Sequence, residues 1–405
     1  VEQVVRVLHS HETQREYRYS AAAILKKQIR AVLSASTFET DLQPCFCLLP
    51  DDHLKLTVVS NNPSVVSSFH LTLSEHLHSI SNTAKFYFPA NEEEEHIWRL
   101  LDETPATEHI ISMVAYRQRY DDNFDVLCRI DTIEVEISLN NNQELCFLAF
   151  LEVVSKLVGQ RHLFKRSLLL IRAWWVYEGA VLSDGSIKHY LPDNAVALMT
   201  CAIFNLYHLQ IQSPLQALCI FLMESSAFDG AVSAITLQGI VPIAEGATSI
   251  HEIVRARKPP TEHHLLDADT LNNYMELFAA ASKVPSASQQ ASVVADSPSN
   301  TSVGSRGSAG GRKSKPHLER GPFTVLHPFE ASNMVTEKLS ARRVAKLTKL
   351  LESGASQLGE VLTGVNENKW EAEKIMQGFF PTILSRFKDT WRPRSEERRV
   401  GKECR

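Results

Sequence analysis

Several side chains that could take part in chemistry lie in the stretch LPDDHLKL at residues 49–56, where an acidic pair precedes an apolar segment. Alternate residues of a strand face the same way, so His53 and Lys55 would share one face if a strand begins here. Carboxylates at these two positions would suit a divalent cation, because Mg²⁺ takes oxygen ligands. The stretch is therefore either a metal-binding strand that has lost its ligands or a Pro-Asp turn that leads into an ordinary core strand.

Other acidic and metal-binding residue types give no complete site by spacing alone. The E-V-E of residues 134–136 lies on an expected strand, but one pair of carboxylates cannot complete two metal sites. The D-A-D of residues 267–269 lies in a polar stretch without strand character and is interpreted as a helix N-terminal cap. Cys45 and Cys47 have no second pair and no nearby histidine, so core packing is the preferred interpretation over a zinc site.

Two regions with different hydrophobic patterns must position these residues. In residues 1–139, an amphipathic helix over residues 15–33 is followed by short apolar runs that alternate with helical stretches. Residues 140–282 contain long apolar segments separated by glycine, Asp-Gly and Ser-Pro, which is typical of packed helices. The sequence therefore predicts an α+β fold, in which a mixed sheet with helices precedes an all-helical domain.

The rest of the chain divides into three further segments. Residues 283–321 are rich in serine, glycine and basic residues, and we expect a disordered linker there. Residues 322–393 are expected to return to the helical domain, with a helix over residues 335–362. Residues 394–405 match the translation of a common sequencing adapter and are expected to be a scar, and a start at Val1 without methionine suggests a fragment.

Composition limits the partners and the compartment. The chain has 405 residues, 42 Lys and Arg against 47 Asp and Glu, and a formal net charge of −5. Because nucleic acid is bound through excess positive charge, any such binding must come from a local groove. No run approaches the roughly 18 apolar residues of a membrane helix, and no signal peptide is visible. We therefore expect reduced cysteines, no membrane association, and a place in the cytoplasm or nucleus.

Four segments resemble a known family in their order and spacing. They are HLFKRSLLLIRAWWVYEGAVL at residues 162–182, SPLQALCIFLMESSAFD at 213–229, LQGIVPI at 237–243 and HPFEASNMVTEKLS at 327–340. Together they resemble the nucleotidyltransferase (DNA polymerase beta-like) superfamily of the poly(A) polymerase, terminal uridylyltransferase and oligoadenylate synthetase type, and most closely its plant-type branch. The resemblance covers roughly half of the chain. It implies an N-terminal nucleotidyltransferase palm, a helical substrate-binding domain, and a nucleotide in the cleft between them.

The resemblance also implies roles for individual palm residues. The family carries Gly-Ser and three carboxylates, two of them as D-x-D on one strand, to hold two Mg²⁺ ions against the nucleotide phosphates. Asp41 and Leu42 stand at the Gly-Ser positions. His53 and Lys55 stand at the two aspartates, and Glu136 of IEVEIS stands at the third. The motif is therefore degenerate, with one carboxylate at three ligand positions.

These replacements would remove the chemistry that the family performs. Asp41 would bring negative charge against phosphate, and Lys55 would place an ammonium where a dication should bind. Phosphoryl transfer depends almost entirely on positioning and charge stabilisation, so two-metal catalysis is expected to fail. An ion pair between Lys55 and Glu136 across adjacent strands is expected in place of the metal site.

The nucleotide contacts that the resemblance implies are partly kept. Arg172 stands at the lysine that reaches the triphosphate, and a guanidinium can contact phosphate with two hydrogen bonds. Lys165 and Arg166 match a basic pair of the same helix, and a solvated basic face explains them equally well. Asn194 replaces a tyrosine that would stack on the base, and His327 replaces an aspartate of the late segment.

Three functions are compatible with these residues. The leading hypothesis is a catalytically degenerate nucleotidyltransferase-fold protein that binds RNA, a nucleoside triphosphate or a protein partner. The second is an active enzyme that uses Mg²⁺ or Mn²⁺ to add ATP or UTP residues to RNA 3′ ends, with a faulty gene model between residues 37 and 56. The third is a non-catalytic scaffold that binds no nucleotide. The loss at Asn194 favours the scaffold, and Arg172 argues against it.

Overall fold

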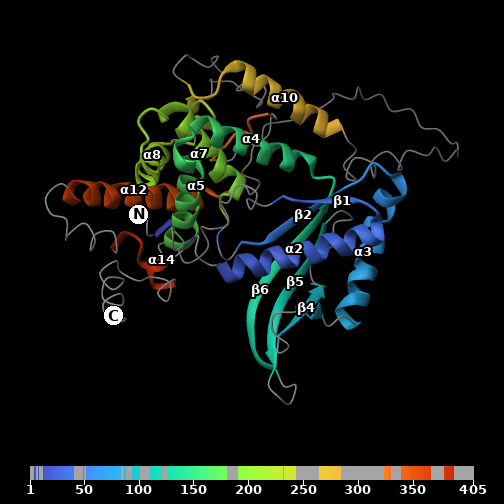
Figure 1. Cartoon of the computed structure of the whole chain (residues 1–405). Coiled ribbons are helices and arrows are strands. Elements are labelled where there is room, and N and C mark those ends of the chain that lie inside the picture. Colours follow the sequence, from blue (N-terminus) through green and yellow to red (C-terminus); the bar gives the residue numbers. More distant parts are fainter. Residues whose placement is uncertain are drawn as a thin grey trace, which may run out of the picture. The chain divides into compact units, whose positions relative to one another are not determined.

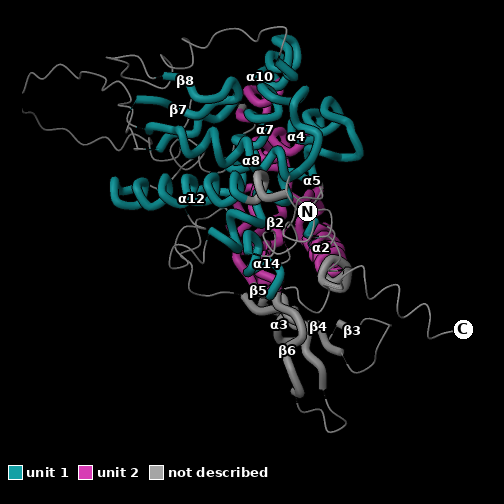
Figure 2. The backbone as a smooth tube through the Cα atoms, turned by 90° about the vertical axis from the view of Figure 1, so that its left-hand side faces the viewer, with its two compact units in different colours: residues 1–10, 150–276, 313–405 teal, residues 11–149, 277–312 magenta. Residues whose placement is uncertain are grey.

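The computed structural model describes residues 4, 5, 8, 12–40, 49, 52–83, 86–87, 94–100, 110–120, 126–179, 190–230, 232–242, 264–283, 323–329, 339–365 and 378–386. The chain divides into two compact units, which Figure 2 shows in different colours. Unit 1 comprises Val1–Ser10, Phe150–Glu276 and Lys313–Arg405. Unit 2 comprises His11–Ala149 and Leu277–Arg312. The expected linker, apart from its first residue Lys283, and the expected adapter segment lie outside the described residues.

Unit 2 is built on a six-stranded sheet with the order β1-β2-β6-β5-β4-β3 (Figure 1). Strands β2 and β6 are parallel, and the other neighbouring pairs are antiparallel. The strands are β1 (Ser36–Glu39), β2 (Leu54–Val59), β3 (Phe86–Tyr87), β4 (Glu94–Leu100), β5 (Ile110–Tyr120) and β6 (Val126–Leu139). This mixed sheet, together with the helices of both units, confirms the predicted α+β fold.

One face of this sheet carries the hydrophobic core of unit 2. Residues two apart on a strand turn to the same face, and Leu54 and Leu56 of β2 are buried together with Val135 of β6. The helices α2 (Glu12–Leu33) and α3 (Pro63–Thr83) supply apolar side chains to the same cluster. The amphipathic helix expected over residues 15–33 is therefore confirmed, and the intervening strand residues turn to the other face.

Unit 1 is mainly helical and contains a small hairpin. Its elements are α5 (Leu163–Ala173), the π-helix η2 (Trp174–Glu178), α7 (Asp193–Tyr207), α8 (Pro214–Ser226), β7 (Ser233–Thr236), β8 (Gly239–Pro242), α12 (Ala341–Val365) and α14 (Pro381–Arg386). The boundary between the units falls within two helices, α4 (Asn142–Val158) and α10 (Ala268–Lys283). The short 3-10 helix η1 (Gln160–His162) follows α4. The packed helices predicted from the long apolar segments are confirmed. None of the helices in the described part of the chain is long and apolar enough to cross a membrane.

Polar side chains set the starts of three of these helices. Ser213 accepts a hydrogen bond from the backbone of α8, and the Asp267 carboxylate accepts the N–H of Thr270 at 2.7 Å, which lowers the pKa of Asp267. Asp267 therefore caps the start of α10, as the sequence predicts. The helix expected over residues 335–362 begins later, at Ala341, because Ser340 lies before it in non-helical backbone and its hydroxyl accepts the Arg343 N–H at 3.4 Å.

A buried carboxylate ties the C-terminal segment to unit 1. Glu178 is 4% exposed at the end of η2. Its two oxygens accept the backbone N–H groups of Thr382 and Ile383 at 3.2 and 2.9 Å. Burial raises the pKa of Glu178, and these hydrogen bonds oppose the rise only in part.

The contribution of Glu178 to stability is expected to fall as the pH rises. The pKa of Glu178 is higher in the folded state than in the unfolded state, so the folded state binds the proton more readily. The contribution of Glu178 to stability is therefore complete when the pH lies below the pKa of the unfolded state, and it is lost as the pH rises through the pKa of the folded state. The ordinary pKa of a glutamate carboxyl is 4.5. We predict that above this pH the free energy of unfolding falls more steeply in the wild type than in Glu178→Gln. Urea unfolding across this range measures both slopes, and equal slopes would rule out the contribution.

Candidate functional site on the sheet of unit 2

The LPDD stretch ends in a hydrogen-bonded turn. Leu49 is 1% exposed, and its N–H donates to the Asp52 carboxylate at 2.6 Å. The Asp52 N–H donates back to the Leu49 carbonyl at 3.1 Å, and the Arg18 guanidinium on α2 donates to the Asp52 carbonyl. These contacts set the direction in which the chain enters β2, as the interpretation of a turn before a core strand predicts. Pro50 and Asp51 lie outside the described residues.

Strands β2 and β6 bring the predicted motif positions together on one face of the sheet. In the parallel register Lys55 lies opposite Glu136. His53 directly precedes β2, and its Nε2 lies 3.1 Å from Oε2 of Glu134. Because Leu54 faces the core, its neighbours His53 and Lys55 turn to the opposite face together with the two carboxylates.

This face places His53 beside Glu134 and Lys55 opposite Glu136. The side chains of His53 and Glu134 are 52% and 56% exposed, so their contact contributes at most about 1 kcal/mol to stability. Lys55 and Glu136 are half-buried. Their register favours the predicted ion pair, which stays a prediction.

Polar and apolar side chains continue the face on either side of the charged positions. Ser112 of β5 lies opposite Glu136. Two residues further along β2 from Lys55, Thr57 lies opposite Phe38 of β1. Ile110 lies at the start of β5. Phe38 is 46% exposed and Ile110 is 38% exposed. An exposed aromatic ring beside polar and charged groups is a surface on which a base could stack.

The donor set on this face does not fit two divalent cations. A two-metal site needs carboxylates that converge on ions about 3.5–4 Å apart, and two of the three motif positions here are His53 and Lys55. Glu136 is the one carboxylate at those positions. Across the part of the chain that the structure describes, no group of three His, Cys, Asp or Glu side chains is placed to hold a metal ion.

Arg172, the predicted triphosphate contact, is buried within unit 1. It is 1% exposed on α5, and its Nη2 lies 2.8 Å from Oδ1 of Asp193, the first residue of α7. Asn194 is the next residue and is half-buried. A phosphate would have to compete with the Asp193 carboxylate for this guanidinium. The nucleotide contacts of Arg172 and Asn194 stay predictions.

Lys165 also lies beside a carboxylate of unit 1. Its Nζ lies 2.6 Å from Oε1 of Glu152 on α4, and the Lys165 side chain is 12% exposed. Lys165 is thus held by a carboxylate rather than solvated, and Arg166 beside it is half-buried. A contact between Lys165 and phosphate stays a prediction.

The remaining motif positions fall in two groups. Asp41 and Leu42 lie outside the described residues, so their place at the Gly-Ser positions stays a prediction. His327 is described, and its Nδ1 accepts the N–H of Phe329 at 3.3 Å. Phe329 packs edge-on against Phe150 of α4, with ring centroids 4.9 Å apart. The late segment is therefore joined to the helices of unit 1 by aromatic packing.

Sequence reasoning missed a polar residue that connects the elements of unit 1. Asn205 is 1% exposed in α7. Its Nδ2 donates to the Leu237 carbonyl at 2.8 Å, and its Oδ1 accepts the Leu266 N–H at 2.9 Å. The available signal was one amide within the apolar run AVALMTCAIFNLY, because a buried amide must find hydrogen-bond partners.

Residues 158–296 match the protein-family model described as the PAP/OAS1 substrate-binding domain. A comparison with curated proteins gives no match.

Several solved structures are similar to the chain at low sequence identity. A structure of Cid1, studied for its RNA terminal uridylyl transferase activity, is 11% identical, with 86% of this chain and 89% of that chain covered and a TM-score of 0.47. A structure of a cytoplasmic RNA terminal U-transferase is 10% identical, with 88% and 92% covered and a TM-score of 0.47. The match to the PAP/OAS1 substrate-binding domain model thus extends over residues 158–296, about a third of the chain.

Proposed function

We propose that this protein is a catalytically degenerate nucleotidyltransferase-fold protein that binds RNA or a nucleoside triphosphate without transferring a nucleotide. The observation that carries the proposal is the charge arrangement on the sheet of unit 2. There His53 contacts Glu134, and Lys55 lies opposite Glu136. The PAP/OAS1 substrate-binding domain supports the fold in which this arrangement occurs.

The physical argument concerns what a divalent cation would meet on this face. Phosphoryl transfer in this fold needs metal ions to stabilise the charge that develops on the phosphates. Glu134 already contacts His53 and Glu136 lies opposite Lys55, so a dication would have to compete with these side chains for the two carboxylates. The Lys55 ammonium would also repel the dication. Binding can survive this loss, because the exposed Phe38 ring offers a base a stacking surface on the same face.

The proposal predicts that an RNA primer stays unextended. The protein would be incubated with a 3′-hydroxyl RNA, Mg²⁺ or Mn²⁺, and each nucleoside triphosphate in turn, and the RNA lengths resolved on a gel. A terminal uridylyl transferase in parallel reactions shows that the RNA and the metals support extension. A ladder of added residues from this protein would overturn the proposal and favour the active enzyme, and re-reading the coding sequence between residues 37 and 56 would then locate the fault.

A scaffold that binds no nucleotide is the second candidate, and the buried Arg172 favours it. The Arg172 guanidinium lies against Asp193, and Lys165 lies against Glu152, so both predicted phosphate contacts are engaged by carboxylates of unit 1. A ligand that binds only the folded state raises the melting temperature. Titration with ATP, UTP and a short single-stranded RNA therefore separates the candidates: a rise with any of them supports the binder, and no rise with all three supports the scaffold.

A further inference from the structure

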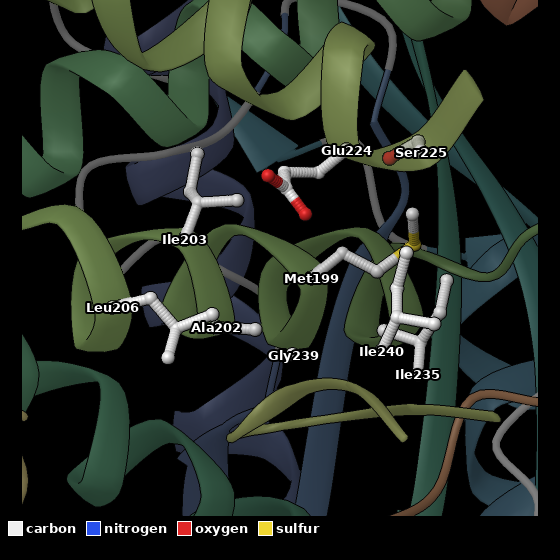
Figure 3. Close-up of a pocket in the computed structure, with 9 residues that line it drawn as sticks. All are labelled: Met199, Ala202, Ile203, Leu206, Glu224, Ser225, Ile235, Gly239 and Ile240. Atoms are coloured by element: carbon white, nitrogen blue, oxygen red, sulfur yellow. The ribbon is translucent and has the colours of Figure 1, made fainter. Parts of the chain in front are cut away.

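A hollow within unit 1 lies between α7, the end of α8 and the β7–β8 hairpin (Figure 3). Gly239 brings the hairpin close to α7, because a Cβ at this residue would lie 2.7 Å from Cδ1 of Leu206. The hollow has room for about one water molecule, so it does not hold an organic ligand. A partner of unit 1 would therefore be bound at the surface of the unit rather than in this hollow.

The helix α12 carries a row of cations on its exposed side. Arg342, Lys346 and Lys349 are exposed, and they are four and three residues apart, so they lie on one face of the helix. These three residues are the basic stripe. Residues 340–351 contain no aspartate or glutamate, although the whole chain has a formal net charge of −5. The basic stripe is therefore a local positive surface, which nucleic-acid binding by an acidic chain requires.

The opposite face of α12 is used for packing within unit 1. Leu347, Leu350 and Leu351 are buried, and Gly354 lies against Trp174. Among the α12 residues whose exposure the structure describes, no large apolar side chain is exposed. Folded protein partners are anchored by apolar and aromatic side chains, and a membrane surface takes up an apolar helix face. The basic stripe therefore fits a partner that is recognised by its negative charge, which is a polyanion.

The stability of α12 does not explain these cations. Arg342 lies in the first turn, where the helix dipole disfavours positive charge, and this turn has no acidic residue. Among the residues that the structure describes, neither Arg342 nor Lys349 forms an ion pair. Arg343 has a structural role, since its guanidinium carbon lies 5.5 Å from the centroid of the Tyr190 ring. The charges of Arg342 and Lys349 are thus available to a partner of the chain.

We propose that the basic stripe binds the phosphate backbone of an RNA strand. The stripe shares no residue with the sheet face of unit 2, so it adds a second surface to the proposed function. The choice of RNA over another polyanion rests on that proposed function. Contacts to phosphate hold a strand in place without reading its sequence, which suits a surface of cations without apolar or aromatic anchors.

The length of the basic stripe fits several phosphates. Arg342 and Lys349 are seven residues apart, which is about 10 Å along the helix axis. Successive phosphates of one duplex strand are about 3.4 Å apart along the axis, so the stripe can face about two or three of them. The Arg342 guanidinium can hold a phosphate with two hydrogen bonds, and the two lysines act as point charges.

The test is the salt dependence of RNA binding by the full chain. Fluorescence anisotropy with labelled oligouridylate gives the affinity at several salt concentrations, and each phosphate contact contributes about 0.7 to the slope of log affinity against log salt. Arg342→Gln/Lys349→Gln removes two exposed charges and is expected to make this slope shallower by about 1.4. The loss of affinity should be the same with oligoadenylate, because phosphate contacts do not read the base.

A matched double variant controls for the change in net charge. Lys156 and Arg161 are also exposed in unit 1, on α4 and η1. Lys156→Gln/Arg161→Gln removes the same two charges, and it should leave the slope unchanged. Phe38→Ala removes the stacking surface on unit 2, so it should weaken RNA binding without changing the slope. This difference separates the two surfaces.

Three results would overturn the proposal. If RNA binds the wild type and Arg342→Gln/Lys349→Gln with the same slope, the basic stripe is not the site, and the proposed function stands. If the wild type binds no RNA, this proposal and RNA binding on unit 2 are both wrong. If the wild type binds oligoglutamate through Arg342 and Lys349 more tightly than it binds RNA, the partner is an acidic protein segment instead.

Discussion

Replacing Gly354 with alanine is expected to lower the free energy of unfolding by about 2 kcal/mol. Gly354 is a buried residue of α12, and a Cβ there would lie 2.6 Å from Cζ2 of Trp174 and 3.4 Å from Cδ2 of Leu222. Trp174 is 1% exposed and stacks on Phe379, with ring centroids 6.4 Å apart, so the ring is held in place. The overpacking outweighs the roughly 1 kcal/mol that alanine gains over glycine inside a helix.

The same helix offers a matched control. Gly359 also lies inside α12, but a Cβ there would meet no atom within 4 Å. Gly359→Ala is therefore expected to raise the free energy of unfolding, by about 0.5–1 kcal/mol. Urea unfolding followed by circular dichroism measures both variants. If both substitutions changed the stability in the same direction, the close packing of Gly354 on Trp174 would be wrong.

Replacing Asn205 with alanine is expected to cost about 3 kcal/mol of stability. The substitution removes both hydrogen bonds of the Asn205 side chain, and it leaves the Leu237 carbonyl and the Leu266 N–H without that partner. Leu237 and Leu266 are buried, and an unsatisfied buried backbone group costs about 1–3 kcal/mol. The substitution therefore removes a hydrogen bond from the β7–β8 hairpin and another from the segment before α10.

An exposed asparagine of unit 1 controls for the loss of the amide itself. Asn273 lies exposed on α10, and Asn273→Ala should change the free energy of unfolding by less than about 0.5 kcal/mol. Urea unfolding midpoints compare the two variants. Equal midpoints for Asn205→Ala and the wild type would contradict the connecting role of Asn205.

The sheet face could be predicted because strand geometry is local. A period of two places His53 beside Lys55 and Glu134 beside Glu136 on one face of each strand, whatever the rest of the chain does. That β2 and β6 are neighbours was implied by the resemblance, and the parallel register between Lys55 and Glu136 agrees with it. The contact between His53 and Glu134 was not predicted, although it follows from the same register two residues before Lys55 and Glu136.

The surroundings of the basic residues could not be predicted, because they depend on how helices pack. The spacing of Arg172 and Lys165 on one helix gives no sign that α7 would bring Asp193 to the guanidinium or that α4 would bring Glu152 to the ammonium. The same limit applies to Glu178, whose partners lie about 200 residues later in the chain. A charged residue within an apolar helical run does signal that a partner must exist, but it does not say which one.

Binding of Mn²⁺, followed by electron paramagnetic resonance, tests most directly whether the sheet of unit 2 is a metal site. The wild type should bind Mn²⁺ no better than Glu136→Gln does, because His53 and Lys55 occupy two of the three ligand positions. The double variant His53→Asp/Lys55→Asp should gain saturable binding, since it restores three carboxylates to the motif positions. Saturable binding by the wild type that Glu136→Gln abolishes would contradict the account and place a working metal site on this face.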